Sequence, residues 1–263
     1  MKQVTQKRLP ISVCMISGAE ASRIGRALES VAGFASEIIV VLNEDVTDGT
    51  DRIAEQHGAK VFREAWKGHI AQKNSAAQKA TQEWVLGLDA DEAVSPVLRA
   101  ELEKLLDSRS PARHCTAYQF PRCTYYCGRW IRHGDWYPDW KARLWQRGRG
   151  HWGGIDPHDR LEVDGNIGSL RGDLLHYSME SVEHQIQKML RYANDFAAGC
   201  RAQNRRVGAL DLLIRPPWRF CRSFVLKRGF LDGWQGLTIA WMTSLYTFLR
   251  YLKALEDQAG PMA

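Results

Sequence analysis

Short apolar runs alternate with amphipathic segments along the first hundred residues, and this alternation constrains the fold more than any other feature. The periodicity predicts strands at 11–16, 37–42, 60–62 and 84–88 and helices at 21–31, 51–57 and 70–80, with another helix starting near Pro96. Strands that alternate with helices at this spacing build a mostly parallel sheet with both faces covered. The sequence therefore predicts an α/β fold, and nucleotides are common ligands of such folds.

The fourth predicted strand ends abruptly on the acidic residues Asp89, Asp91 and Glu92. Residues two apart in an extended chain face the same way, so Asp89 and Asp91 can project together from the carboxyl end of the strand, where open α/β sheets bind ligands. Mg²⁺ commonly uses one or two protein carboxylates and completes its coordination with substrate phosphates and water. This pattern indicates a diphosphate held by a metal ion. The alternative is an acidic turn that leads into the next helix.

Other nucleotide-binding motifs are absent from the sequence. No Gly-x-Gly-x-x-Gly follows the first predicted strand, and Gly-x-x-x-x-Gly-Lys-[Ser/Thr] occurs nowhere. The sequence therefore supports neither a dinucleotide fingerprint nor a P-loop.

Several short motifs together resemble family 2 glycosyltransferases. They are Ser17-Gly18-Ala19-Glu20, the stretch from Asn43 to Thr50, Gln72-Lys73-Asn74 and Asp89-Ala90-Asp91-Glu92. The likeness extends over nearly the whole chain to a pattern similar to the lipopolysaccharide-core glucosyltransferases, carried by the stretch from Pro138 to Trp145, Pro157-His158-Asp159, Leu175-His176-Tyr177 and the stretch from Gly229 to Trp234. The resemblance implies a GT-A fold, a Rossmann-like mostly parallel sheet, here with a C-terminal helical extension.

The resemblance also implies a nucleotide-sugar donor and a divalent metal, Mg²⁺ or Mn²⁺. Asp91 is then the expected direct metal ligand, and His176 takes the place of the C-terminal histidine that GT-A enzymes often add to the metal shell. Asp89 is expected to contact the ribose or a metal-bound water. The remaining residues expected to bind the nucleotide are Ser17, Glu20, Asn43 and Lys73, of which Lys73 would pair with a phosphate.

The catalytic base should be a carboxylate across the cleft from the metal. Asp159 is the first candidate because His158 and the preceding Gly153-Gly154 turn indicate a loop, and Asp156 is the second; a capping role is the alternative for either. Asp159 as base in a single displacement would invert the anomeric configuration. Two positions depart from the family pattern: Asn43 replaces a carboxylate, and Asp159 replaces a glutamate.

Positive charge is concentrated near the C-terminus. The segment from Arg201 to Gly229 contains eight basic residues and one acidic residue, so it carries a charge of +7, while the whole chain carries +6. Trp218, Phe220 and Phe224 lie among the arginines, and the following apolar stretch, 236–249, is shorter than the roughly 20 residues needed to span a bilayer. We expect an interfacial helix on an anionic membrane surface, with a solvated basic face beside a core helix as the alternative.

These observations predict an inverting, metal-dependent glycosyltransferase that moves a hexose, glucose or another, from UDP to a lipopolysaccharide-core heptose on a lipid-linked acceptor. The alternatives are transfer to a polyprenyl phosphate or a peptide, and a non-catalytic membrane-surface adaptor. We expect no nucleic-acid partner. No export signal is evident, so we expect a cytoplasmic protein, peripheral at the inner face of the membrane. The chain divides into a donor-binding half (1–106), an acceptor-side region (107–177) and a helical tail (178–263).

Overall fold

The computed structural model describes residues 8–107, 114–156, 158–178 and 181–259 and separates into two compact units. The sheet unit comprises Met1–Arg122 and Asp139–His176, and the helical unit comprises Cys123–Pro138 and Tyr177–Ala263. The predicted donor-binding half and most of the acceptor-side region therefore share one unit. Cys123–Pro138 instead joins the C-terminal tail.

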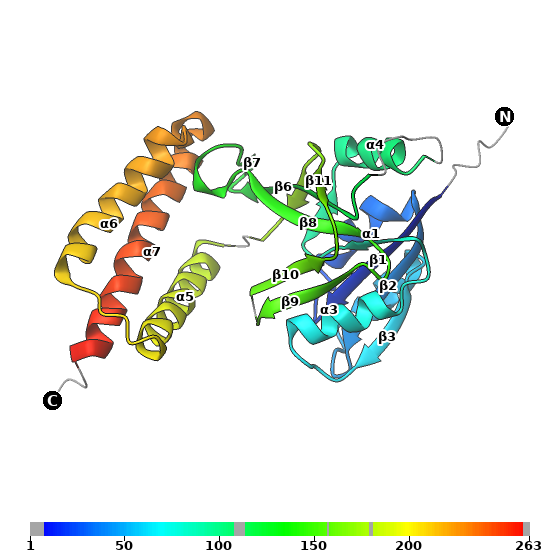
Figure 1. Cartoon of the computed structure of the whole chain (residues 1–263), viewed down its shortest axis with the longest axis horizontal. Coiled ribbons are helices and arrows are strands. Elements are labelled where there is room, and N and C mark those ends of the chain that lie inside the picture. The colour runs from blue at the N-terminus through cyan, green and yellow to red at the C-terminus, as the bar shows by residue number, and fades with distance from the viewer. Residues whose placement is uncertain (1–7, 108–113, 157, 179–180, 260–263) are drawn as a thin grey trace. The chain divides into compact units, whose positions relative to one another are not determined.

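Four parallel strands form the first half of the sheet, in the order β3-β2-β1-β4; β1, β2 and β3 are labelled in Figure 1. They are β1 (Leu9–Ser17), β2 (Ala35–Asn43), β3 (Lys60–Glu64) and β4 (Trp84–Gly87), and the connecting helices are α1 (Ile24–Ala32), α2 (Thr50–Gln56) and α3 (His69–Gln78). These elements confirm the predicted alternation. Helix α4 (Pro96–Leu105) also begins where expected, with Ser95 accepting the Leu98 N–H and proline at the first helical position.

The strands beyond β4 pair mostly antiparallel. They are β5 (Glu92–Val94), β6 (Ala117–Tyr126), β8 (Asp139–Gln146) and β12 (Leu174–His176), with β8 pairing both β4 and β6, and β12 pairing β5. Strand β11 (Ile167–Ser169) pairs β6, and this is the only parallel pairing among the described pairs beyond β4. Strand β9 (Gly150–Ile155) forms a separate hairpin with β10 (His158–Val163). Asn74 ties this hairpin to α3, because its amide exchanges two hydrogen bonds of 2.8 Å with the Trp152 backbone.

Apolar residues fill both faces of the sheet, which explains the near-continuous hydrophobic runs of the central strands. On β2, Ile38 and Val40 belong to the core that includes α1, while Ile39 and Val41 belong to the core that includes residues of α3. Burying each such side chain contributes roughly 1.5–3 kcal/mol relative to leaving it in water. Core packing therefore fixes the strand ends that carry the polar residues.

The helical unit contains α5 (Val182–Ala202), α6 (Ala209–Cys221) and α7 (Gly233–Ala259), with α7 packed against both other helices. Two short turns, η2 (Arg222–Leu226) and η3 (Gly229–Asp232), connect α6 to α7, and β7 (Arg129–Trp130) and η1 (Gly134–Trp136) complete the unit. Buried Asp232 accepts the backbone N–H groups of Arg132 and His133, which gives this part of the Gly229–Trp234 motif a structural role. No helix in the described residues is both long enough and apolar enough to cross a membrane.

Candidate active site

A pocket of about 410 Å³ lies where β1, β2 and β4 end, at the edge of the sheet that the topology favours for ligands. Eight of the nine residues predicted to act in binding or catalysis line it. They are Ser17, Glu20, Asn43, Lys73, Asp89, Asp91, Asp159 and His176.

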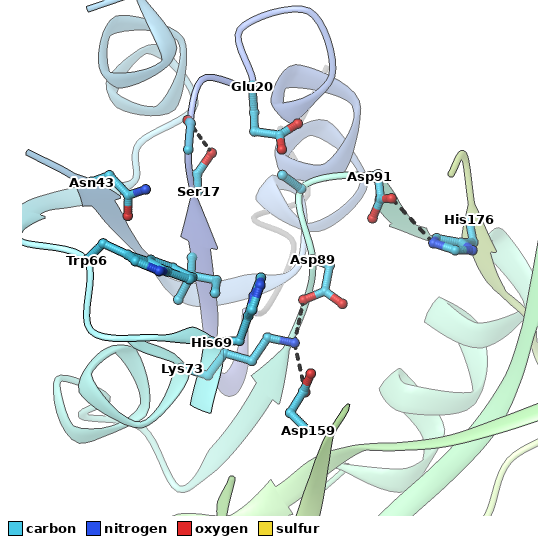
Figure 2. A pocket seen from close by; sticks show the side chains of 13 residues that line it. Ser17, Glu20, Asn43, Trp66, His69, Lys73, Asp89, Asp91, Asp159 and His176 are labelled. Atoms are coloured by element: carbon cyan, nitrogen blue, oxygen red, sulfur yellow. Dashed lines mark hydrogen bonds and ion pairs between the residues drawn. The ribbon is translucent and has the colours of Figure 1, made fainter. Parts of the chain in front are cut away.

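Lys73 joins two of the predicted carboxylates. Its ammonium, on α3, lies 2.9 Å from Asp89 Oδ1 and 2.9 Å from Asp159 Oδ2, as Figure 2 shows. An ammonium has three N–H donors, so these two ion pairs leave one for a ligand. The Lys73 ammonium also lies 4.8 Å from the centre of the Trp152 ring, on the hairpin that carries Asp159. The side chain is therefore held in place on several sides.

Arg143, on β8 beside β4, lies beneath the acidic cluster. Its Nη2 contacts Asp89 Oδ2 at 2.6 Å and Glu92 Oε1 at 3.1 Å. Burial raises the pKa of Asp89, but the charges of Arg143 and Lys73 outweigh burial and hold that pKa well below its usual range. Burial lowers the pKa of Arg143, but Asp89 and Glu92 outweigh it and hold that pKa above its usual value. Both groups therefore stay ionised.

Glu92 points inward rather than into the pocket. Its side chain is fully buried, accepts the backbone N–H of Asp89 at 3.1 Å and pairs with Arg143 and, at 3.4 Å, with Arg122. Arg122 in turn pairs with Asp139 at 2.7 Å. The crowded carboxylates are thus balanced largely by the protein's own cations. The sequence motifs contained Arg143 but gave no sign of this role.

Asp91 differs from its two acidic neighbours because it pairs with a histidine. His176 Nε2 lies 3.3 Å from Asp91 Oδ2, because β12 pairs with β5 and sets His176 opposite Glu92 (Figure 2). Burial raises the pKa of Asp91, but the hydrogen bond and charge of His176 outweigh it and lower that pKa. A carboxylate and an imidazole are suitable ligands for Mn²⁺ or Mg²⁺. In the described residues, no three His, Cys, Asp or Glu side chains group to hold a metal ion, so these two would need substrate phosphates or water to complete a shell.

Asn43 presents an unusual polar atom to the pocket. Its Oδ1 is buried and has no hydrogen-bond partner among the described residues. Buried carbonyl oxygens are normally paired, so this oxygen is suited to a donor group on a ligand. The other two predicted contacts have partners: Ser17 Oγ donates to Gly18 O at 3.1 Å, and Glu20 pairs with Arg23 at 2.6 Å.

The sequence analysis missed Trp66 and His69, which also line the pocket. Their rings meet edge to face with centres 4.8 Å apart, and Trp66 is half-exposed. Figure 2 shows Asn43 and Trp66 on one side of the pocket and Asp91 and His176 on the other. A tryptophan just before a predicted helix was the signal available in the sequence. The ends of the pocket therefore differ: one offers a ring face and an amide, the other a carboxylate and an imidazole.

Asp156 is the predicted candidate that does not line the pocket. Its Oδ1 accepts the Ile70 backbone N–H at 2.9 Å in the first turn of α3, so it has the capping role considered as the alternative. Gly68 precedes α3 with φ of +91°, and a Cβ there would lie 2.3 Å from Asp156 Oδ2. Glycine at position 68 thus permits this contact.

Comparison with known proteins identifies the family. A model of "Glycosyl transferase family 2" matches residues 12–162, which include every pocket residue except His176. The chain belongs to glycosyltransferase family 2.

Relatives of this glycosyltransferase match over most of their length. "Uncharacterized glycosyltransferase RP128" of Rickettsia prowazekii is 31% identical over 92% of this chain and 86% of the relative. "Lipopolysaccharide core biosynthesis glycosyltransferase LpsC" of Rhizobium meliloti is 26% identical over 96% of this chain and 94% of the relative. The solved mannosyltransferase PcManGT from Pyrobaculum calidifontis, in complex with GDP-Man and Mn²⁺, has a TM-score of 0.54 at 14% identity, covering 97% of this chain and 90% of that one. The fold of this glycosyltransferase is GT-A, as predicted.

Proposed function

We propose that this enzyme is an inverting, metal-dependent glycosyltransferase that moves a hexose, in the first instance glucose, from UDP to a heptose of a lipid-linked lipopolysaccharide core. The observation that carries the proposal is a single pocket that holds the Asp91–His176 pair and the carboxylate of Asp159 fixed by Lys73. The acceptor class is supported by the likeness to LpsC along nearly the whole chain. We place the enzyme at the cytoplasmic face of an anionic membrane, where such an acceptor would be met.

The nucleoside would bind at the Asn43 and Trp66 side of the pocket. The buried Oδ1 of Asn43 can accept the N3–H of uracil, and the exposed face of Trp66 can stack on a planar base. Asp89 is held by Arg143 and Lys73, so its carboxylate is rigid and can accept a ribose hydroxyl as a further contact. Ser17 and Glu20 line the same pocket and complete the proposed nucleotide site.

The diphosphate would bind between Lys73 and the Asp91–His176 pair. The third N–H of the Lys73 ammonium can donate to a phosphate oxygen. Asp91 and His176 would hold the divalent metal, and a bound metal of this kind acts as a Lewis acid that stabilises the negative charge of the departing phosphate. Because these two residues supply only part of a shell, metal and nucleotide should bind together more tightly than either alone.

Asp159 would accept the proton of the attacking hydroxyl. Its hairpin is tied to α3 through Asn74, and its carboxylate is fixed by Lys73, so its position does not depend on the acceptor. A base that acts directly on the nucleophile fits a single displacement, in which an α-linked donor gives a β-linked product. In this scheme the first half of the chain binds the donor and the region from 107 to 177 supplies the base and meets the acceptor.

Three aspartate variants test the scheme. Asp159→Asn should lower transfer by about 10²–10⁴-fold and keep UDP affinity, because a general base acts only on the incoming hydroxyl. Asp156→Asn changes the same chemistry three residues away and should keep transfer. Asp91→Ala should abolish turnover and metal-dependent UDP binding with the fold intact.

The assays are transfer from UDP-glucose, UDP-galactose and GDP-mannose to a heptose-containing core oligosaccharide, and UDP binding with and without Mn²⁺. If Asp159→Asn transfers sugar as fast as the wild type, Asp159 is not the catalytic base. Full turnover in excess EDTA would refute the requirement for a metal ion. A preference for GDP-mannose would correct the donor.

A further inference from the structure

The most exposed side chains of helix α7 are apolar over five turns. Its exposed positions between residues 234 and 252 are Trp234, Leu237, Trp241, Leu245, Phe248 and Leu252. They recur at spacings of three and four, so they form one stripe about 27 Å long at 1.5 Å per residue. The opposite side of the helix is buried, with Ile239, Ala240 and Tyr251 in the interior of the unit. The stripe is therefore a second apolar side, which the fold leaves in solvent.

Helix α6 continues this surface. It exposes Leu213 and Pro217 beside Trp241 and Leu245 of α7, and these four residues line one apolar groove of about 590 Å³ between the helices. Leu210, Ile214 and Trp218 extend the exposed apolar side of α6. We call the exposed apolar residues of both helices the α6–α7 face. Contiguous apolar surface of this extent is uncommon on monomeric soluble proteins and marks an interaction surface.

We infer that the α6–α7 face docks on an anionic lipid bilayer and inserts its apolar side chains at the depth of the lipid headgroups. This rests on the proposed membrane location of the enzyme, but no residue of the face lines the active-site pocket. Trp218, Trp234 and Trp241 are 55–61% exposed on the face, and tryptophan is favoured at a membrane–water interface. Because no described helix can cross a bilayer, shallow insertion is the mode that these helices allow.

Positive charge beside the face selects an anionic surface. Arg219, Arg222 and Lys227 all pair with the one buried carboxylate of Asp135, so this cluster keeps a net charge of +2. Arg206 and Arg228 are exposed and make no ion pair among the described residues. The +7 segment therefore keeps an excess of positive charge on α6 and on the connections before and after it, next in sequence to the helices that expose tryptophan and leucine. A protein partner would require no such excess, whereas an anionic leaflet attracts it.

The structure also decides which arginines can test the idea. Changing Arg219 or Arg222 to glutamate would place a second carboxylate beside buried Asp135 and disturb the fold. Arg206→Glu with Arg228→Glu reverses charge at exposed positions instead. Trp241→Glu with Leu245→Glu places charge in the middle of the face. Val97→Glu with Ile167→Glu is the matched control, because it alters exposed apolar residues of the sheet unit.

The experiment is co-sedimentation of each full-length variant with vesicles of equal amounts of phosphatidylglycerol and phosphatidylethanolamine, and with phosphatidylcholine vesicles, at low and high salt. The wild type should bind the anionic vesicles, and high salt should weaken this binding without abolishing it, since salt screens charge but not apolar insertion. Trp241→Glu/Leu245→Glu should weaken partitioning by about tenfold or more, and Arg206→Glu/Arg228→Glu should weaken it chiefly at low salt. The control should bind like the wild type.

Lipid-free hydrolysis of the sugar donor should be the same in all variants, which separates a docking defect from a failure of the proposed chemistry. The inference would be overturned if Trp241→Glu/Leu245→Glu partitioned onto anionic vesicles as strongly as the wild type. It would also be overturned if the wild type bound phosphatidylcholine vesicles as strongly as the anionic ones. A wild-type dimer that ignores vesicles and becomes monomeric in that variant would instead show that the face joins two copies of the chain.

Discussion

Replacing Arg143 with methionine tests whether the buried ion pairs hold the acidic end of β4 in place. The Glu92 side chain is 0% exposed and that of Arg143 is 6% exposed. Removing the arginine therefore leaves carboxylate charge in the interior without its main partner. Breaking a buried pair costs about 3–5 kcal/mol. Because Glu92 keeps Arg122 and Asp89 keeps Lys73, we expect the lower end, about 3 kcal/mol. For a protein of this size that lowers Tm by roughly 6–12 °C.

A double-mutant cycle with Glu92→Gln separates charge pairing from packing. Glutamine still offers an oxygen to the Asp89 N–H, so this change removes chiefly the charge. The Arg143→Met/Glu92→Gln protein should be more stable than the sum of the single changes predicts, with a coupling of about 2 kcal/mol. Arg149→Met is the control: Arg149 and its partner Asp164 are exposed, 3.4 Å apart, and the loss should stay below about 1 kcal/mol.

The pH dependence has a defined sign. Arg143 helps to hold the pKa of Asp89 below its usual range, so this carboxylate stabilises the fold above its unfolded-state pKa of about 3.8 and loses that contribution as the pH falls. In Arg143→Met the pKa of Asp89 is depressed less, so the two stability curves should converge on acidification. Urea unfolding followed by circular dichroism between pH 7 and pH 2 measures the difference, because the contribution of Asp89 is lost only as the pH falls below about 3.8. The reasoning would be refuted if the stability losses of Arg143→Met and Glu92→Gln simply added in the double variant. It would also be refuted if Arg143→Met lost no more stability than Arg149→Met.

Three further outcomes are expected. Trp66→Ala should weaken UDP binding by about tenfold, since stacking of a nucleobase on an aromatic ring contributes roughly 1–3 kcal/mol. Calorimetric titration with UDP at saturating Mn²⁺ measures the affinity, and an unchanged affinity would show that the uracil does not stack on Trp66. His176→Ala should raise the Mn²⁺ concentration needed for half-maximal UDP binding without changing Tm by more than a few degrees, and an unchanged Mn²⁺ requirement would exclude His176 from the metal shell. Burial raises the pKa of Glu37, but hydrogen bonds from Lys60, Ser12 and Thr81 outweigh it and lower that pKa to about 2. Glu37→Gln should therefore lose the stabilisation that this carboxylate provides above pH 4.5, at most about 3 kcal/mol, and its free energy of unfolding should fall less steeply than that of the wild type below that pH. Parallel curves of unfolding free energy against pH for the two proteins would contradict this.

The position of the pocket was predictable because it depends on local patterns. Apolar periodicity locates β1, β2 and β4, and the first polar residues after each run must meet at one sheet edge when the strands are parallel. Asn43 and Asp89 therefore line the pocket as expected. Trp66 escaped notice because it lies in a loop, where no periodicity indicates which way a side chain points. His69 escaped notice because it is the first residue of α3 and precedes the predicted start of that helix at residue 70.

Sequence alone thus determined the alternating α/β order, the acidic end of β4 and the family, since each depends on residues that are close together in the chain. Only the tertiary structure decided how the charges combine: Lys73 meets Asp159 across 86 residues of chain, and Arg143 meets Asp89 across 54. The same holds for α7, whose apolar sequence looks uniform until the packing of α5 and α6 buries one side and leaves the other in solvent. Burial and ion pairing depend on which surfaces meet in space, and long-range contacts of this kind leave no local pattern in the chain.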